Sequence, residues 1–79
     1  MDYDCKKVDE MVLALLALTM FKDKHRVRAW KSHDWDAMDR LHTKGYISDP
    51  ESQAKSVVMT EEGERLAQKL FGEHFGGVA

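Results

Sequence analysis

The sequence predicts a single α+β domain over residues 1–79, with the order helix, strand, helix, β-hairpin, helix. The first observation is composition: 79 residues with 43% hydrophobic and 33% charged side chains are typical of one small globular domain. The second is that apolar residues recur at helical spacing in three stretches, with shorter valine-containing stretches between them. The third is that capping and turn residues lie at the boundaries of these stretches.

Residues 5–21 are expected to form the first helix, because the apolar side chains MVLALLALTMF lie at helical positions. At about 100° per residue these side chains cover an arc of roughly 220°, which is wider than packing on one side requires. Either the helix contacts a second copy of the chain, or later elements of the same chain wrap around it. In the dimer interpretation, the partner-facing residues are Leu13, Leu16 and Met20. The side that then faces the subunit's own core carries Met11, Leu15 and Leu18.

Residues 21–25 (FKDKH) are expected to form a loop, because most of them are charged. Residues 26–31 (RVRAWK) are expected to form a short strand, with Val27 and Ala29 on one face and Trp30 on the other.

The next helix should begin after a cap at Ser32 or Asp34 and should run to about Lys44. Gly45 suits the left-handed position just past its end. Its expected buried face contains four residues spaced three or four apart, namely Trp35, Met38, Leu41 and His42.

The stretch after Gly45 is expected to form a hairpin and then the last helix. Tyr46–Ser48 and Lys55–Met59 are its two strands, with a turn beginning at Asp49-Pro50. In the second strand Val57 and Met59 should share a face opposite Val58. Thr60 then caps a helix with Glu61 and Glu62 in its first turn, where the helix dipole favours negative charge. The helix continues through Leu66, Leu70, Phe71 and Phe75 and ends at Gly76-Gly77.

Two motifs in this order resemble winged helix-turn-helix regulators of the MarR and PadR kind. They are Leu41-x-x-Lys44-Gly45-Tyr46-Ile47 and Val57-x-Met59-Thr60-x-Glu62-Gly63, so the resemblance covers about residues 34–70. It implies a winged-helix-like fold in which residues 46–59 form the wing. The segments RAWK, DWDAMDRLHTKGYI and AKSVVMTEEG also resemble a family of small bacterial proteins classed as a domain of unknown function. That second resemblance implies a fold and a bacterial origin.

Charge is concentrated in one segment of the chain. Five cations and one carboxylate give residues 22–31 a net charge of +4, so the remainder carries −6 of the total of −2. This segment can bind either the phosphates of a nucleic acid or an acidic partner protein, or it can be a solvated loop. The candidate binding residues are Lys22, Lys24, Arg26, Arg28, Lys31 and Lys55.

Reading of the major groove is disfavoured by the sequence. The helix that would enter the groove carries Asp34, Asp36 and Asp39 at its start, and carboxylates repel phosphates. A helix-turn-helix also needs a supporting helix immediately before the recognition helix, and strand and loop residues are expected in that position here.

No catalytic residues, metal ligands or cofactor are expected. The histidines and Cys5 lack the spacing of zinc motifs, and there is no nucleophile elbow and no glycine-rich phosphate loop. Trp30 and Trp35 are expected to be core or interface residues, with a ligand pocket between them as the minor alternative.

The leading hypothesis is therefore a non-catalytic regulatory or interaction module that forms a homodimer. The alternative is a small DNA-binding transcription regulator that uses residues 22–31 and the wing, assisted by Arg40 and Lys44. A lone cysteine and the absence of a signal peptide or membrane span predict a cytoplasmic protein.

Overall fold

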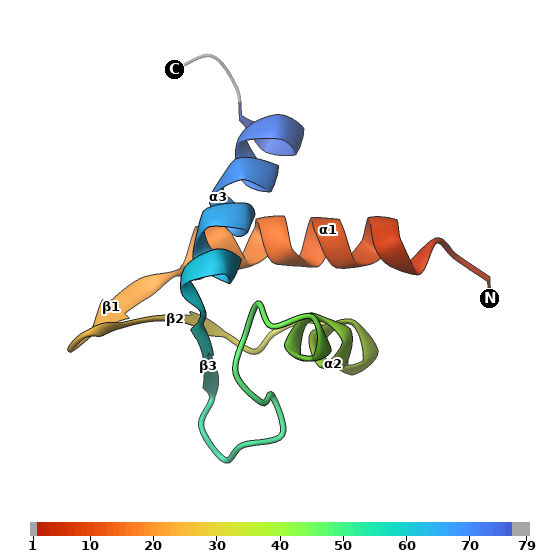
Figure 1. The fold of residues 1–79 in the computed structure, drawn as a ribbon. Helices are drawn as coiled ribbons and strands as arrows, with labels where there is room; N and C mark the ends of the chain where they lie inside the picture. Colours follow the sequence, from red (N-terminus) through yellow and green to blue (C-terminus); the bar gives the residue numbers. More distant parts are fainter. Residues whose placement is uncertain (1, 77–79) are drawn as a thin grey trace.

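The computed structural model describes residues 2–76, which form three α-helices and a three-stranded antiparallel sheet (Figure 1). The sheet order is β1-β2-β3, and the α+β class expected from the sequence is confirmed. Gly77, expected at the end of the last helix, lies outside the described residues. In chain order the elements are α1 (Cys5–Leu16), a 3₁₀ turn (Ala17–Thr19), β1 (Phe21–Asp23), β2 (Arg26–Trp30), α2 (Trp35–Thr43), β3 (Ser56–Met59) and α3 (Glu61–Phe75).

Helix α1 is shorter than the sequence predicted. It begins at its cap Asp4, whose carboxylate accepts a hydrogen bond from the Lys7 backbone N–H, and it ends at Leu16. The chain then tightens into the 3₁₀ turn and becomes extended at Met20, with φ −64° and ψ 136°. The predicted end at residue 21 was wrong, because periodicity alone does not register this change of direction.

The expected loop at residues 21–25 is instead the first half of a hairpin. Phe21 pairs with Arg28 and Asp23 with Arg26, and Lys24 turns the chain with a φ of 58°. The Phe21 ring packs on the Trp30 ring at a centroid distance of 5.0 Å. Charged side chains suit an edge strand, so their abundance did not exclude strand structure.

The inner face of the sheet follows the predicted alternation. Val27 pairs with Met59 and Ala29 with Val57, and three of these four side chains are buried. The expected strand Tyr46–Ser48 is reduced to one bridge, between Ile47 and Met59.

Helix α2 begins and ends as expected, but its buried face differs. The Asp34 carboxylate accepts a hydrogen bond from the Ala37 backbone N–H, and Ala37, Met38 and Leu41 are buried. Trp35 is 58% exposed and His42 is also exposed, so their assignment to the buried face was wrong. Ala37 and Trp35 are two residues apart and therefore lie on opposite sides of the helix, so burial of Ala37 leaves Trp35 outward.

Helix α3 crosses α1 and packs against it (Figure 1). Its cap is Thr60, whose hydroxyl accepts a hydrogen bond from the Gly63 backbone N–H, as predicted. Gly63 lies directly against the backbone of Tyr46, at a separation that leaves no room for a Cβ atom. Gly45 adopts the expected left-handed conformation, with a φ of 83°.

The core contradicts the predicted roles of the α1 leucines. Leu13 and Leu16 are 1% and 0% exposed within a single chain, so they cannot be the contacts of a dimer. Met20 is half-buried and packs against the same core. Leu18, expected in the core, is 65% exposed. Later elements of the same chain therefore wrap around α1, and α2 and α3 supply most of its contacts.

Candidate functional site

The sheet distributes the predicted cationic residues over different surfaces. Arg26 and Arg28 alternate with the core-facing residues of β2, so they lie on the face of the sheet opposite the core. Lys22 pairs with Val27 and therefore lies on the core-facing side. Lys31 is tied to a neighbouring loop, because its amino group donates to the Ser52 carbonyl oxygen at 2.7 Å. Lys55 is exposed in the same loop region.

An aromatic and basic surface results on the outside of the sheet. We call it the outer sheet face and define it by Phe21, Asp23, Arg26, Arg28, Trp30 and Val58, where Asp23 is the cross-strand neighbour of Arg26. Trp30 is 48% exposed, so of its two expected roles, core or interface, the core role is excluded. Arg28 is held in place, since its Nε donates to Ser56 Oγ at 2.7 Å and its Nη2 to the Ser56 carbonyl oxygen at 2.9 Å. One stacked aromatic pair thus lies beside two guanidinium groups.

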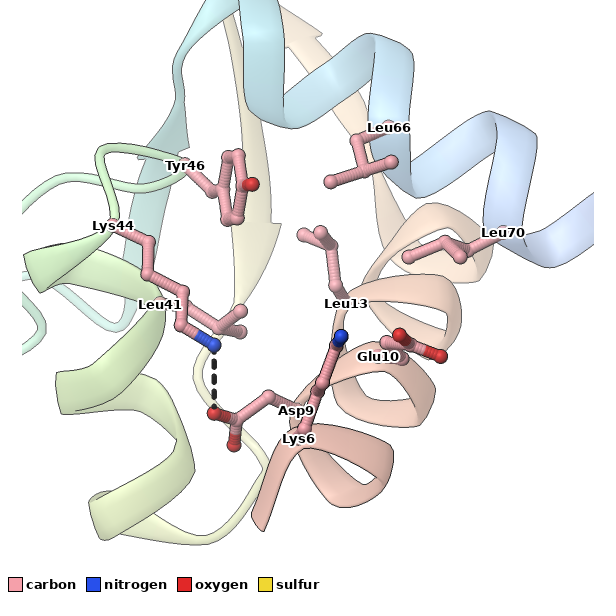
Figure 2. Close-up of a pocket in the computed structure, with 9 residues that line it drawn as sticks. All are labelled: Lys6, Asp9, Glu10, Leu13, Leu41, Lys44, Tyr46, Leu66 and Leu70. Carbon is pink, nitrogen blue, oxygen red and sulfur yellow. Dashed lines mark hydrogen bonds and ion pairs between the residues drawn. The ribbon is translucent and has the colours of Figure 1, made fainter.

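A second feature is a pocket bounded by all three helices, which we call the three-helix pocket (Figure 2). Its volume is about 140 Å³. Apolar side chains from the three helices and the Tyr46 ring form its walls, and charged side chains from α1 and α2 stand at one side. The lining residues are Lys6, Asp9, Glu10, Leu13, Leu41, Lys44, Tyr46, Leu66 and Leu70.

Asp9 is the buried charge of this pocket, at 2% exposure. Arg40 Nε donates to both of its carboxylate oxygens, at 2.9 and 2.8 Å, and Lys44 Nζ donates to Oδ2 at 3.3 Å. Arg40 Nη2 lies 2.8 Å from Oδ1 but outside hydrogen-bonding geometry. A buried carboxylate is costly unless it is paired, and here two cations from α2 and its C-terminal cap offset that cost.

The hydrogen bond to Asp9 raises the pKa of Arg40 above its ordinary value, so this side chain remains a cation throughout the physiological pH range. Sequence reasoning missed the Asp9 network entirely. The signal was present, because Asp9, Leu13 and Leu16 lie at helical spacing on one stripe of α1. An acidic residue in line with core leucines requires a cationic partner. Arg40 and Lys44, which were assigned a supporting role in DNA binding, supply that partner instead.

Acidification is expected to lower the stability of the folded protein through protonation of His33. Burial lowers its pKa below the ordinary 6.5, so the unfolded chain binds a proton more readily than the folded chain. Stability is therefore present above pH 6.5 and declines as the pH falls from 6.5 toward the lower pKa of the folded state. In urea unfolding at pH 7.5 and 5.5, His33→Gln is expected to lose less stability on acidification than the parent protein. His25→Gln, at the exposed hairpin turn, should behave like the parent, and equal losses in all three proteins would contradict this explanation.

Two properties of residues 2–76 concern metal ligands and membrane-spanning helices. Across this range no three histidine, cysteine or acidic side chains come together as a metal site. None of the helices described is both long and apolar enough to cross a bilayer. Cys5 is exposed as a free thiol.

Comparison with known proteins places the chain in a family. Residues 4–77 match the family described as a domain of unknown function (DUF6429), and the chain belongs to this family. An uncharacterised protein of Sinorhizobium fredii (strain NBRC 101917 / NGR234), y4hR, is 45% identical over 75 residues, which cover 95% of this chain and 97% of that protein. The expected resemblance to a bacterial family of unknown function is thus confirmed. No solved structure matches the chain.

Proposed function

We propose that this family member is a non-catalytic regulatory module whose outer sheet face binds an acidic segment of a partner protein. The observation that carries the proposal is the exposed Trp30, stacked on Phe21 and flanked by Arg26 and Arg28. Tryptophan and arginine are the residues most often found at the energetic centres of protein interfaces. Arg28 is already oriented by Ser56, so its ordering on binding costs little conformational entropy.

A protein partner is favoured over duplex DNA because too few cations converge. Proteins that hold duplex DNA through its backbone commonly make about 6–10 phosphate contacts. The outer sheet face carries two arginines and the carboxylate of Asp23, while Lys22 lies on the core-facing side and Lys31 is bonded to Ser52. One observation supports the alternative of a small DNA-binding regulator. The hairpin tip brings Lys24, His25 and Arg26 together around a surface depression that Asp23 and Arg28 also line.

We also propose a winged-helix-like frame, a homodimer and a location in the bacterial cytoplasm. The winged-helix-like frame is supported by the order of the elements. It is also supported by pairing of the segment around Ser48 with β3, where Ser48 N–H donates to the Val58 carbonyl oxygen at 2.9 Å. Support for the dimer is Leu18 of the 3₁₀ turn that follows α1, because this large apolar side chain is 65% exposed. A free thiol at Cys5 suits a reducing compartment.

The partner class is tested by fluorescence anisotropy with two labelled probes, a glutamate-rich peptide and a random DNA duplex. The peptide is expected to bind the protein more tightly than the duplex does at 150 mM salt. Arg26→Glu combined with Arg28→Glu should weaken peptide binding at least tenfold, because both positive charges on the outer sheet face are reversed. Lys22→Glu is the matched control on the other side of the sheet and should have little effect. If instead the duplex binds and the peptide does not, the DNA-binding alternative replaces this proposal.

A further inference from the structure

The three-helix pocket has the walls of a small apolar binding site. Leu13 from α1, Leu41 from α2, and Leu66 and Leu70 from α3 surround it, and the Tyr46 ring closes one side (Figure 2). Its volume of about 140 Å³ is close to that of a leucine-lined cavity of ~150 Å³ known to hold a six-carbon ring. The pocket therefore accommodates a ligand body of about five or six carbon atoms.

The charged side of the same pocket has an excess of positive charge. Arg40 and Lys44 face the single carboxylate of Asp9, so one of these two charges is not balanced there. Lys6 lies on α1, three residues before Asp9. Within residues 2–76 the Lys6 amino group has no ion pair or hydrogen bond. Figure 2 shows the amino groups of Lys6 and Lys44 directed toward the pocket from α1 and from the end of α2.

The acidic side chains beside the pocket do not outweigh its cations. Both Asp9 oxygens accept hydrogen bonds from Arg40, and Glu10 lies 3.9 Å from His74 of α3, a contact that is an ion pair only when His74 is protonated. Arg40, Lys44 and Lys6 exceed these two carboxylates by one charge, and a cationic ligand would have to compete with Arg40 for Asp9. An anionic ligand meets two amino groups with spare donors, since each ammonium has three hydrogens and Lys44 gives Asp9 only one hydrogen bond.

We propose that the three-helix pocket binds a small carboxylic acid with a branched aliphatic body. The carboxylate accepts hydrogen bonds from Lys44 Nζ and Lys6 Nζ, and the hydrocarbon displaces water from among the leucines. A site lined mainly by leucine offers close packing to a branched chain and only one ring, Tyr46, for aromatic stacking. The inference rests on the pocket alone and does not depend on the outer sheet face.

The test is a titration of the ¹⁵N-labelled protein with isovalerate, monitored by amide chemical shifts. Saturable shifts are expected at pocket residues such as Leu13, Leu41 and Leu66, with a dissociation constant no weaker than the millimolar range. Isovaleramide has nearly the same shape without the charge and should bind at least tenfold more weakly. Isoamylamine, which reverses the charge, should not bind in the pocket.

Matched lysine variants separate the pocket from general charge effects. Lys6→Gln should weaken isovalerate binding several-fold, because it removes one of the two amino groups at the pocket. Lys7→Gln is the control, since Lys7 is exposed on the same turn of α1 but does not line the pocket. Neither residue belongs to the hydrophobic core, so both variants are expected to fold and to give comparable spectra.

Three results would overturn the proposal. The first is the absence of shifts at pocket residues at 20 mM isovalerate. The second is equal binding of the acid and the amide, which would remove the role of the lysines. The third is a shift of the same residues with protein concentration alone, which would identify a side chain of a second copy as the occupant of the pocket.

Discussion

Gly63→Ala is expected to leave the protein largely unfolded at 25 °C. An added Cβ would lie within contact distance of the Tyr46 carbonyl group, whose oxygen also accepts a hydrogen bond from the Thr60 backbone N–H. Overpacking of this kind commonly costs about 1–3 kcal/mol and sometimes more. The obstructing atoms here belong to the backbone and cannot rotate away, so we expect a cost above that range. A core of this size provides only ~3–5 kcal/mol.

Gly72→Ala is the matched control on the same helix. No atom lies within 4 Å of a Cβ built at Gly72, so alanine adds helix propensity without a collision. A gain of about 0.5–1 kcal/mol is expected. Urea unfolding followed by circular dichroism measures both variants. A Gly63→Ala protein as stable as the parent would show that α3 can move away from Tyr46, and the close approach would then have no structural importance.

Leu16→Glu is the second change with a large expected effect. Leu16 is 0% exposed, so the substitution places a carboxylate in the core with no cation prepared for it. Burial of an unpaired ionised carboxylate costs far more than the stability of a domain this small. The expected result is an unfolded chain with a random-coil circular dichroism spectrum. A folded protein with a reduced light-scattering mass would instead restore the original assignment of Leu16 to a dimer interface.

Leu18→Glu, two residues further on in the 3₁₀ turn, is the control and also tests the dimer. Leu18 is 65% exposed, so the variant is expected to remain folded. If the proposed dimer forms through this side of α1, its light-scattering mass should fall to that of a monomer. A parent protein that is monomeric at millimolar concentration would rule out the dimer.

Local signals predicted the fold well where one residue type decides the geometry. Asp34 and Thr60 cap their helices, Gly45 is left-handed, and Val57 and Met59 face the core as expected. The errors occur where tertiary packing decides. The wide apolar arc of α1 was compatible with a partner chain or with the same chain, and only the positions of α2 and α3 distinguish the two.

The candidate sites could be predicted less well than the fold. The cations of residues 22–31 were identified from charge alone, but the strand pairing that separates Lys22 from Arg26 depends on a hairpin whose edge strand was not expected. The three-helix pocket joins residues 6–13 to residues 41–46 and 66–70. The spacing of residues within one segment cannot reveal that three distant segments of the chain meet at one pocket. The placement of Asp9 on the core stripe of α1 was the one local indication.

The Asp9 network also restricts how α2 can dock on α1. Apolar faces tolerate sliding by a helical turn, because one leucine replaces another at similar cost. Asp9 removes that freedom in one direction, since a shift of α2 by one turn would bring Asp36 to the position of Arg40 and oppose two carboxylates. A single buried charge thus makes one alignment of two short helices far more favourable than its neighbour. In a small domain with few core residues, we expect that selectivity to favour a single native packing.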